Sequence, residues 1–330
     1  MVNPNTWLIT GGAGYIGAHI ADAFLKDGKN VIVYDSLYRG LESRIEYLRD
    51  KYKREIPLVV ADIRDTEAFT AALLAYKPEG IIHTAALKAV GESMDKAHEY
   101  FEVNFEATQE LIKIVSSNEI HHFIFSSTAA VYGFPSHVNP VKEDDPKNPI
   151  SPYGASKLAA EAEVNLFLTN PGNFGTSLRF FNVVGSASFE LLDNSVDNLV
   201  PIVINSLKSG ETPSIFGTDY ATPDGTCIRD YVDVRDVARA HLMAAKSISA
   251  LPHSMNVGTG YGVSVREVIK LLSDAFSQPQ KKTIELGRRV GDSDSVVAEV
   301  SLIYSALDFK AQYSFEETID SLFKFTSLLE

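Results

Sequence analysis

The sequence has very little cysteine: its 330 residues include only Cys227. An intrachain disulfide is therefore impossible, and a zinc site built on several cysteines is excluded. No run approaches the roughly 18 consecutive apolar residues that a membrane-spanning helix needs. Residues 1–6 lack the basic stretch followed by an apolar one that is typical of a signal peptide. We therefore expect a soluble cytoplasmic protein with no membrane partner and no bound metal.

Positive charge is also scarce. Thirty lysines and arginines stand against 43 aspartates and glutamates, which gives a formal net charge of −13. An acidic surface repels a nucleic-acid backbone, so we expect no nucleic-acid partner, although a few well-placed arginines can still bind a small anion. Hydrophobic residues make up 45% of the chain, which is ordinary for a protein with a sizeable core.

The first half of the chain alternates short apolar runs with longer amphipathic ones. This order predicts strand, helix, strand connections and a parallel sheet that helices cover on both faces. The expected strands are Trp7–Thr10, Val31–Asp35, Leu58–Asp62, Gly80–Ala85, Phe123–Thr128 and Ser177–Phe181. The expected helices are Ile16–Lys26, Leu41–Lys53, Glu67–Tyr76, Glu99–Ser117 and Tyr153–Thr169.

The alternation ends after Phe181. Residues 182–225 are rich in Asn, Asp, Ser, Pro and Gly, with one helix expected near Leu199–Leu207. We predict an α/β fold, with a Rossmann-type doubly wound parallel sheet and a smaller mixed α/β C-terminal lobe. Residues 1–181 would form the nucleotide-binding domain, with 226–260 returning to it, and residues 182–225 and 261–330 would form a substrate lobe. Such sheets bind ligands beyond the carboxyl ends of their strands.

A glycine-rich loop follows the first predicted strand and opens the first predicted helix. Its glycines fall as G-x-x-G-x-x-G at Gly11, Gly14 and Gly17. The first permits a tight turn, the second lets the backbone approach a pyrophosphate, and the third lets the helix pack closely on the sheet. The free N–H groups at the start of the helix then attract phosphate. A tight turn that binds no ligand is the alternative interpretation.

Two acidic residues at strand ends point to the same ligand. Asp35 ends the second predicted strand, about 20 residues beyond the loop, where a carboxylate can bind the hydroxyls of an adenosine ribose. An acid there repels a 2′-phosphate, which favours NAD over NADP, although Arg39 lies close by. Asp62 and Ile63 end the third strand beside the expected adenine edge, with a helix N-cap as an equal alternative for Asp62.

A tyrosine and a lysine form the candidate catalytic pair. Tyr153 and Lys157 are spaced i, i+4, so a helix would present both on one face. The fifth predicted strand ends in Ser126, Ser127 and Thr128, whose hydroxyls would face that helix. A tyrosine titrates near ~10, and a neighbouring cation lowers its pKa by roughly 1–3 units, towards the range where a general base works. Thr128 would hold the same substrate oxygen while NAD takes the hydride.

These motifs together resemble the extended short-chain dehydrogenase/reductase superfamily and, within it, the UDP-hexose 4-epimerases. The resemblance covers nearly the whole chain, and the stretch 87–93 is its most specific part. The matching segments are residues 10–17, 83–93, 123–133, 151–157, 179–182, 215–220, 224–231 and 288–292.

The resemblance implies a reversible oxidation at C4 of a UDP-sugar. Tyr153 would remove the 4-hydroxyl proton while NAD takes the hydride, the 4-keto sugar would turn over, and the hydride would return to its other face. NAD would stay bound, and the enzyme would be a homodimer. Lys157 would hold the nicotinamide ribose and Lys88 the pyrophosphate, with a solvated loop lysine as the alternative for Lys88. The other implied cofactor contacts are Tyr15, Ile16, Ser36, Thr84, Ala85, Ser126, Phe180 and Asn104, for which a structural amide is equally expected.

The resemblance also implies a site for the UDP half of the substrate, to which Lys88, Thr128 and Tyr153 contribute. Arg229 and Arg289 would pair with the phosphates, with surface ion pairing to Asp230 or Asp292 as the alternative. Val296 would lie beside the sugar, or Ser295 if the register slips by one, and either small residue would admit N-acetyl sugars. The remaining implied contacts are Asn182, Asn198 and Leu199 near the diphosphate and uracil, Phe216 by the uracil and Asp292 at the uridine ribose.

Four other functions are the alternatives. A nucleotide-sugar dehydratase is disfavoured, because its chemistry needs an acid–base pair. The resembling dehydratases carry that pair directly after the strand-end threonine, where Ala129 and Ala130 stand in this sequence. An ordinary alcohol dehydrogenase would release NADH, and a non-catalytic NAD-binding protein would not need Thr128, Tyr153 and Lys157. An epimerase for a UDP-pentose is also compatible with these residues.

Overall fold

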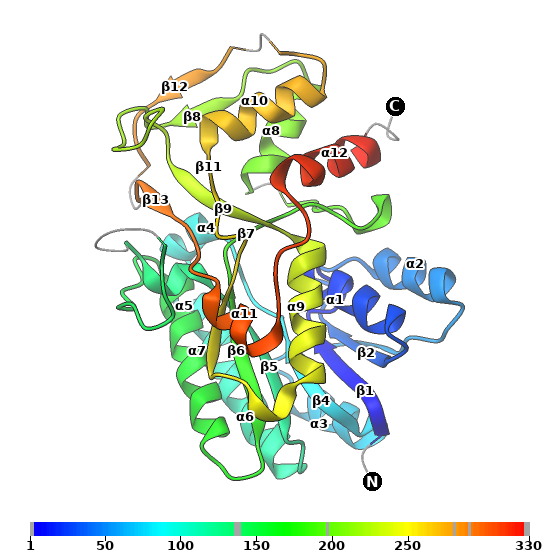
Figure 1. Ribbon diagram of the computed structural model, residues 1–330. Helices are drawn as coiled ribbons and strands as arrows, with labels where there is room; N and C mark the ends of the chain where they lie inside the picture. Colours follow the sequence, from blue (N-terminus) through cyan, green and yellow to red (C-terminus); the bar gives the residue numbers. More distant parts are fainter. Residues whose placement is uncertain (1–2, 135–139, 196–197, 280–281, 290–291, 327–330) are drawn as a thin grey trace.

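The computed structural model describes residues 3–134, 140–195, 198–279, 282–289 and 292–326. Its largest element is a seven-stranded parallel sheet with the strand order β10-β6-β5-β4-β1-β2-β3 (Figure 1). These strands are β1 (Asn3–Thr10), β2 (Asn30–Asp35), β3 (Leu58–Val60), β4 (Pro78–His83), β5 (His122–Thr128), β6 (Phe174–Phe180) and β10 (Ser254–Val257). The predicted Rossmann-type sheet is thus confirmed.

Helices cover both faces of this sheet. One face carries α1 (Tyr15–Lys26), α2 (Glu42–Tyr52) and α9 (Val234–Lys246), and the other carries α3 (Thr66–Tyr76), α6 (Ala107–Ser117) and α7 (Pro152–Leu168). Because successive strand residues point to opposite faces, Trp7 and Ile9 pack beneath α1 and α9, whereas Leu8 packs beneath α3, α6 and α7. This double burial explains why the strands are apolar throughout.

Several element bounds differ from the sequence prediction by a few residues, and three differences bear on the site. The third strand ends at Val60, two residues early, because the chain already turns at Asp62. The single helix expected over Glu99–Ser117 is α5 (Ala97–Phe101), a π-helical turn η1 (Glu102–Glu106) and α6. A short helix, α4 (Val90–Asp95), occupies the segment after β4 for which no helix was expected.

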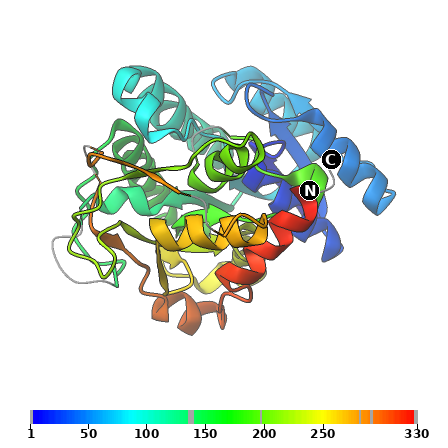
Figure 2. The same ribbon diagram turned by 90° about the horizontal axis from the view of Figure 1, so that it is seen from above.

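The smaller lobe lies beyond the carboxyl ends of the sheet. It contains a four-stranded sheet in which β9 (Ile228–Asp233) pairs with β7 (Asn182–Val184), β11 (Gly262–Ser264) and β13 (Ser295–Val296), and a two-stranded sheet of β8 (Ser214–Phe216) and β12 (Ile284–Leu286). The helices α8 (Leu199–Lys208), α10 (Val265–Ala275) and α12 (Phe315–Thr326) pack together over it (Figures 1 and 2). Two short turns, η2 (Ala129–Tyr132) and η3 (Phe189–Leu191), and α11 (Ser301–Leu307) complete the regions that matter below.

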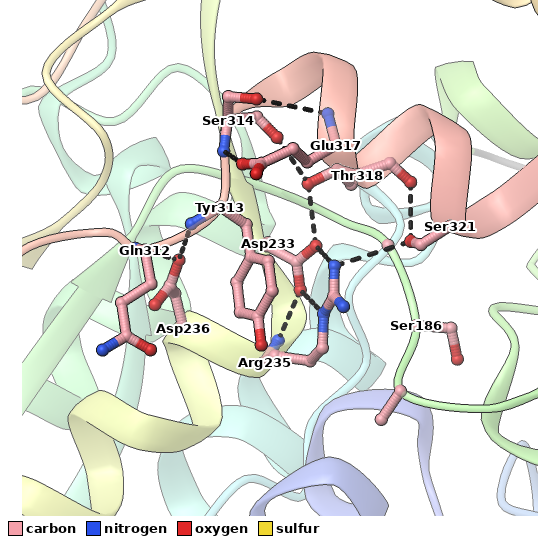
Figure 3. Close-up of polar contacts among 12 residues, drawn as sticks. Ser186, Asp233, Arg235, Asp236, Gln312, Tyr313, Ser314, Glu317, Thr318 and Ser321 are labelled. Atoms are coloured by element: carbon pink, nitrogen blue, oxygen red, sulfur yellow. Dashed lines mark hydrogen bonds and ion pairs between the residues drawn. The ribbon is translucent and has the colours of Figure 1, made fainter.

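A buried carboxylate joins the two parts of the molecule (Figure 3). Asp233 caps α9 by accepting hydrogen bonds from the Arg235 backbone and side chain at 2.8 Å, and it also accepts one from the Thr318 hydroxyl of α12 at 2.7 Å. The Arg235 guanidinium lies 3.6 Å from the centre of the Tyr313 ring. Since α9 packs on the large sheet and α12 covers the smaller lobe, this cluster fixes the lobe above the cleft.

Candidate active site

A cavity of about 950 Å³ runs along the carboxyl ends of the strands. All the predicted cofactor contacts except Asn104 line it, and three predicted contacts of the UDP half line its far end. The lining residues from the two predicted sets are Gly11, Gly14, Tyr15, Ile16, Gly17, Asp35, Ser36, Asp62, Ile63, Thr84, Ala85, Lys88, Ser126, Thr128, Tyr153, Lys157, Phe180, Asn182, Asn198 and Leu199. The fold therefore gathers residues from the carboxyl ends of six strands, β1 to β6, into one continuous space.

The glycine loop forms a cradle in which the backbone packs too closely to leave room for a side chain at Gly11 or Gly17. Gly11 has a φ of +67°, and a Cβ there would lie 2.7 Å from the Ala85 nitrogen. A Cβ on Gly17 would lie 2.2 Å from the Gly11 carbonyl oxygen, so α1 could not pack where it does. No side chain caps α1 at Gly14, and the first N–H groups of a helix have no intrahelical partners. These features fit the pyrophosphate of a dinucleotide.

Asp35 is held by the backbone around it. Its carboxylate accepts hydrogen bonds from the Ala13 nitrogen at 2.9 Å and from the Leu37 nitrogen at 2.8 Å. Burial raises the pKa of Asp35, while these N–H groups act in the opposite direction. Carboxylate lone pairs beyond those two bonds can receive ribose hydroxyls, so the arrangement fits the adenosine end of NAD.

Asp62 has a different role from the N-cap considered as its alternative. Its carboxylate accepts two hydrogen bonds from the Arg64 guanidinium, at 2.9 and 2.8 Å, and this interaction lowers the pKa of Asp62. The residue that caps α3 is Asp65, which accepts from the Ala68 nitrogen at 2.9 Å. The N-cap interpretation of Asp62 is therefore wrong, and Asp62 stays at the rim of the cavity with Ile63.

The candidate catalytic pair, Tyr153 and Lys157, lies on α7 as the spacing predicts. Ser151 caps this helix by accepting from the Gly154 nitrogen at 3.1 Å, and Pro152 occupies its first turn. A Cβ on Gly154 would lie 2.6 Å from the Ala130 carbonyl oxygen, so a glycine lets α7 approach the end of β5 closely. Tyr153 thereby comes within hydrogen-bonding reach of Thr128.

Burial dominates the protonation of this pair. It raises the pKa of Tyr153, although the hydrogen bond from Thr128 lowers it in part, and it lowers the pKa of Lys157 to about 7. We expected Lys157 to lower the pKa of Tyr153. The structure does not show that lowering. The desolvation that keeps the Tyr153 phenol protonated also favours the neutral form of Lys157. The ammonium lies 4.1 Å from the centre of the Phe125 ring.

A buried ion pair stands behind Lys157, one helical turn further along α7. Glu161 accepts hydrogen bonds from Arg179 at 2.9 and 2.6 Å and from the Ser127 hydroxyl at 2.5 Å, and both charged side chains are at most 4% exposed. The charge on Glu161 raises the pKa of Lys157 against the effect of burial. The sequence prediction missed this carboxylate, although the spacing of Tyr153, Lys157 and Glu161 at i, i+4 and i+8 places all three on one helix face.

Asn104 serves the structure of the cofactor site from outside it. It lies in the π-helical turn, and its amide accepts from the Leu87 nitrogen at 2.8 Å and donates to the Leu87 oxygen at 2.9 Å and to the Ser156 hydroxyl at 3.1 Å. The residue is 1% exposed and does not line the cavity. The geometry thus favours the structural-amide interpretation, in which Asn104 holds the segment that carries Lys88.

The remaining predicted contacts of the UDP half lie outside the lining of this cavity: Phe216 on β8, Arg229 on β9, Val296 on β13, and Arg289 and Asp292 in the segment between β12 and β13. Arg229 donates to Asp292 at 3.1 Å, and the Arg289 guanidinium lies 3.9 Å from the centre of the Phe216 ring. Val296 lies opposite Arg229 in the β13–β9 pairing. Residues 290 and 291 of the 288–292 motif lie outside the described residues.

One of the two ion pairs considered for the arginines is present and the other is not. Arg229 pairs with Asp292, as the alternative interpretation allowed. Asp230 instead accepts hydrogen bonds from the Thr259 hydroxyl at 2.7 Å and from the backbone of Gly260 and Ala298, and its side chain is buried. Pairing with Asp230 is therefore wrong.

The described part of the chain offers neither a metal-binding cluster nor a membrane-spanning helix. No group of three or more His, Cys, Asp or Glu side chains in this part of the chain is arranged to hold a metal ion. Across the same ranges, none of the helices is both long enough and apolar enough to cross a membrane.

The chain is similar to known proteins along nearly its whole length. Residues 7–258 match the NAD dependent epimerase/dehydratase family. The chain is 36% identical to a UDP-glucose 4-epimerase of Halalkalibacterium halodurans over 94% of its own length and 92% of that protein. It is 32% identical to a UDP-glucose 4-epimerase of Corynebacterium glutamicum, with 98% and 96% of the two chains covered.

Solved structures give the same picture. The UDP-glucose 4-epimerase of Bifidobacterium longum in complex with NAD+ and UDP superposes with a TM-score of 0.91 at 32% identity, covering 98% of each chain. The UDP-Glc/GlcNAc 4-epimerase of Campylobacter jejuni superposes with a TM-score of 0.85 at 34% identity, covering 98% of this chain and 99% of that one.

Proposed function

This chain belongs to the NAD dependent epimerase/dehydratase family, and we propose that it is an NAD-dependent 4-epimerase that interconverts UDP-glucose and UDP-galactose through a 4-keto sugar. The observation that carries the proposal is the single cavity that joins the glycine loop to Tyr153 and Thr128 and continues to Asn182. One molecule bound in that space can meet a hydride acceptor and a proton acceptor together. The identity to UDP-glucose 4-epimerases over nearly the full chain supports the choice of sugar.

NAD, when bound, accepts a hydride from C4 of the sugar and returns it. The residues that would hold NAD are the glycine loop at the pyrophosphate, Asp35 at the adenosine ribose and Lys157 at the nicotinamide ribose. Asp35 and the loop are fixed by backbone hydrogen bonds, which makes this part of the site ready for its ligand before the ligand arrives.

Tyr153 acts as the base and then as the acid at the sugar's 4-oxygen. Its phenol oxygen takes the hydroxyl proton while the hydride leaves C4, and it returns the proton after the sugar has turned over. Thr128 holds the same oxygen throughout, and the Lys157 ammonium stabilises the phenolate. Because one group performs both proton steps, the reaction is symmetric and needs no exchange of protons with water.

The UDP half anchors the sugar while its ring rotates. Arg229 and Arg289 bind the diphosphate through their guanidinium forks, and Asn182, Asn198 and Leu199 contact the diphosphate and uracil. Asp292 releases Arg229 when it binds the uridine ribose. A dehydratase remains disfavoured, because Ala129 and Ala130 of η2 carry no group that could expel water from C5 and C6.

The pocket beside the sugar is expected to admit N-acetyl groups. Val296 packs against a cluster of apolar residues that includes Ala298 and Tyr132. A valine is smaller than the tyrosine that restricts the resembling epimerases to glucose and galactose. We therefore include UDP-GlcNAc and UDP-GalNAc among the substrates. A UDP-pentose is the remaining alternative.

We also propose that the enzyme works as a homodimer in the cytoplasm. Its single cysteine, Cys227, is buried and free, which is compatible with a reducing compartment. The homodimer is what the resemblance to the UDP-hexose 4-epimerases implies. Analytical ultracentrifugation of the purified protein decides between a dimer and a monomer.

The test of the proposed function is direct. The purified protein is incubated separately with UDP-galactose, UDP-GalNAc and UDP-arabinose, and the C4 epimers are resolved by chromatography. We expect UDP-glucose from the first and UDP-GlcNAc from the second. Failure of UDP-galactose to react would overturn the proposal, and turnover of UDP-arabinose alone would replace the hexose with a pentose. Reaction of UDP-galactose without UDP-GalNAc would reject only the role of Val296.

A further inference from the structure

An ion pair crosses the rim of the cofactor cleft. Arg39 follows β2, Glu92 belongs to α4 after β4, and the guanidinium donates to the carboxylate at 2.5 Å. In the sheet, β1 lies between β2 and β4, and two strands with a third between them are about 10 Å apart. The loop that follows β1 is the glycine loop, so the Arg39–Glu92 pair bridges the segments on either side of the pyrophosphate cradle. Tyr38 and Arg39 line one side of the cavity there, and Leu87 and Lys88 line the other.

Glu92 is held more firmly than an ordinary surface carboxylate. Besides Arg39, it accepts hydrogen bonds from Lys96 at 3.0 Å and from the Tyr100 hydroxyl at 2.9 Å. These three donors lower the pKa of Glu92 to about 2, so it is an anion throughout the physiological range. An isolated pair of exposed charges contributes little because its side chains move freely, whereas three donors from separate positions fix this carboxylate in one place.

The anchor of Glu92 reaches the catalytic tyrosine. Tyr100 is fully buried, and its hydroxyl also lies 2.8 Å from the Ala89 carbonyl oxygen. Its ring meets the ring of Tyr153 edge to face, with 6.4 Å between the centroids. The position of Glu92 is thus set from the protein interior, by a residue that packs on the reaction centre.

Arg39 lies at a position where an NADP-dependent enzyme of this fold would use an arginine to bind the cofactor. An arginine near the end of the second strand of such a fold accommodates the 2′-phosphate of NADP. Here Arg39 comes four residues after Asp35 and lines the same cavity, but its guanidinium is engaged by Glu92. The Arg39–Glu92 ion pair therefore joins the segments on either side of the cleft. It also engages the guanidinium that would otherwise be available to a 2′-phosphate.

We propose that Arg39 and Glu92 form a clasp that slows the release of NAD, and that Glu92 excludes NADP by occupying Arg39. The inference rests on the proposed function in assuming that the cavity holds NAD. It goes beyond that function because it assigns cofactor retention and cofactor choice to two residues outside the reaction centre.

Two variants separate the two halves of the proposal. Glu92→Gln and Arg39→Gln both open the clasp, but only Glu92→Gln leaves a free guanidinium beside the adenosine site. Glu110→Gln is the matched control, because Glu110 forms an exposed ion pair with Lys113 at 2.7 Å on α6, away from the cleft. Thermal unfolding of each variant shows whether the fold is intact.

The experiment measures the bound cofactor rather than activity. Each holoenzyme is diluted into isotopically labelled NAD, and the exchange rate is followed by mass spectrometry. NADP is then titrated to find the concentration that displaces half of the bound NAD. We expect both clasp variants to exchange NAD roughly fivefold faster than the wild type and Glu110→Gln, as the loss of one ion pair allows. We expect NADP to displace NAD at a several-fold lower concentration from Glu92→Gln relative to Arg39→Gln.

The outcomes are distinguishable. Exchange at the wild-type rate in both clasp variants would overturn the clasp, and equal displacement by NADP in both would overturn the exclusion of NADP. A protein that binds no NAD at all would instead defeat the proposed function. Normal epimerisation with unchanged exchange would leave that function intact and reject only this inference.

Discussion

The two ends of the cleft are built on different principles. At the cofactor end, the protein backbone holds the functional groups, as when Asp35 accepts from Ala13 and Leu37. At the uridine end, candidate groups hold one another, as when Arg229 pairs with Asp292. A preorganised site binds without losing existing contacts, whereas a site of mutually paired groups must exchange partners. We infer that the first end keeps its ligand while the second takes and releases one in each cycle.

The largest expected effect comes from removing Tyr153, the proposed base, which lies between the two ends. In Tyr153→Phe the ring stays in place while the proton acceptor is lost, so turnover of UDP-galactose should fall by ~10²–10⁴-fold. Both ends of the cleft remain, so bound NAD and affinity for UDP should be unchanged. Steady-state kinetics, with UDP as a competing ligand, measures turnover and the affinity for UDP. Mass spectrometry of the holoenzyme measures bound NAD. A variant with nearly full turnover would show that the base lies elsewhere.

Adding one methyl group at the cofactor end should abolish most of its NAD binding. In Gly17→Ala the new Cβ would meet the Gly11 carbonyl oxygen at 2.2 Å, so α1 must move away from the loop. Overpacking of this kind costs about 1–3 kcal/mol, and we expect the protein to be purified with little NAD. The control is Gly287→Ala in the smaller lobe, where a Cβ would meet no atom within 4 Å. Full NAD content in Gly17→Ala would show that the cradle does not depend on this packing.

The uridine end should weaken without disturbing the cofactor. Arg229→Gln removes the charge-assisted contact that we propose with the diphosphate, and we expect KM for UDP-galactose to rise roughly 10–100-fold. NAD content and kcat should change little, because Arg229 lies outside the lining of the cavity that contains Tyr153 and Thr128. Arg266→Gln, which removes an exposed pair with Glu285 at 3.0 Å, is the control. A loss of kcat at unchanged KM would place Arg229 outside the substrate site.

The smallest expected effect is a shift in pH dependence at the middle of the cleft. Lys157 has a pKa of about 7 in the folded protein, and the charge on Glu161 raises it. Activity that needs the ammonium is lost as the pH rises through this value, so Glu161→Gln should move the alkaline limb of the kcat profile to lower pH. Glu163→Gln is the control on the same helix, since Glu163 pairs with Gln109 of α6. An unmoved limb in Glu161→Gln would show that Glu161 only supports the fold.

The effect of Lys157 on stability has a defined sign. Its pKa is lower in the folded chain, near 7, than the ordinary value of 10.5. Between these values the unfolded chain binds more protons, so the free energy of unfolding contributed by this group rises with pH in that window. Below about pH 7 the lysine is charged in both the folded and the unfolded chain, so the cost of burying the ammonium lowers the free energy of unfolding by its full amount.

Sequence reasoning located the cofactor end more completely than the uridine end, for a physical reason. The glycine loop, Asp35 and the Tyr153–Lys157 pair are read from short-range spacing on strands and helices that the apolar pattern defines. The pairing of Arg229 with Asp292 spans 63 residues, and the Arg39–Glu92 and Glu161–Arg179 pairs likewise join separate elements. Short-range sequence patterns do not show which residues far apart in the chain come into contact.

The same limit explains the errors within the predicted site. Burial set the pKa of Tyr153, and burial depends on how α7 packs rather than on the residues beside it. Asp62 pairs with Arg64 rather than capping α3, because the turn after β3 places Asp65 at the cap instead. For Asn104, the resemblance left a cofactor contact and a structural amide equally open, and the hydrogen bond from the Leu87 nitrogen to its amide favours the structural amide.

The measurement that tests the central claim most directly follows the hydrogen at C4. UDP-galactose labelled with deuterium at C4 is converted by the holoenzyme in the presence of excess free NAD, and product and cofactor are analysed by mass spectrometry. If the cofactor end keeps NAD while the uridine end exchanges its sugar, the deuterium stays at C4 of UDP-glucose and free NAD remains unlabelled. Deuterated NADH in solution, or UDP-glucose that has lost its deuterium, would contradict that account.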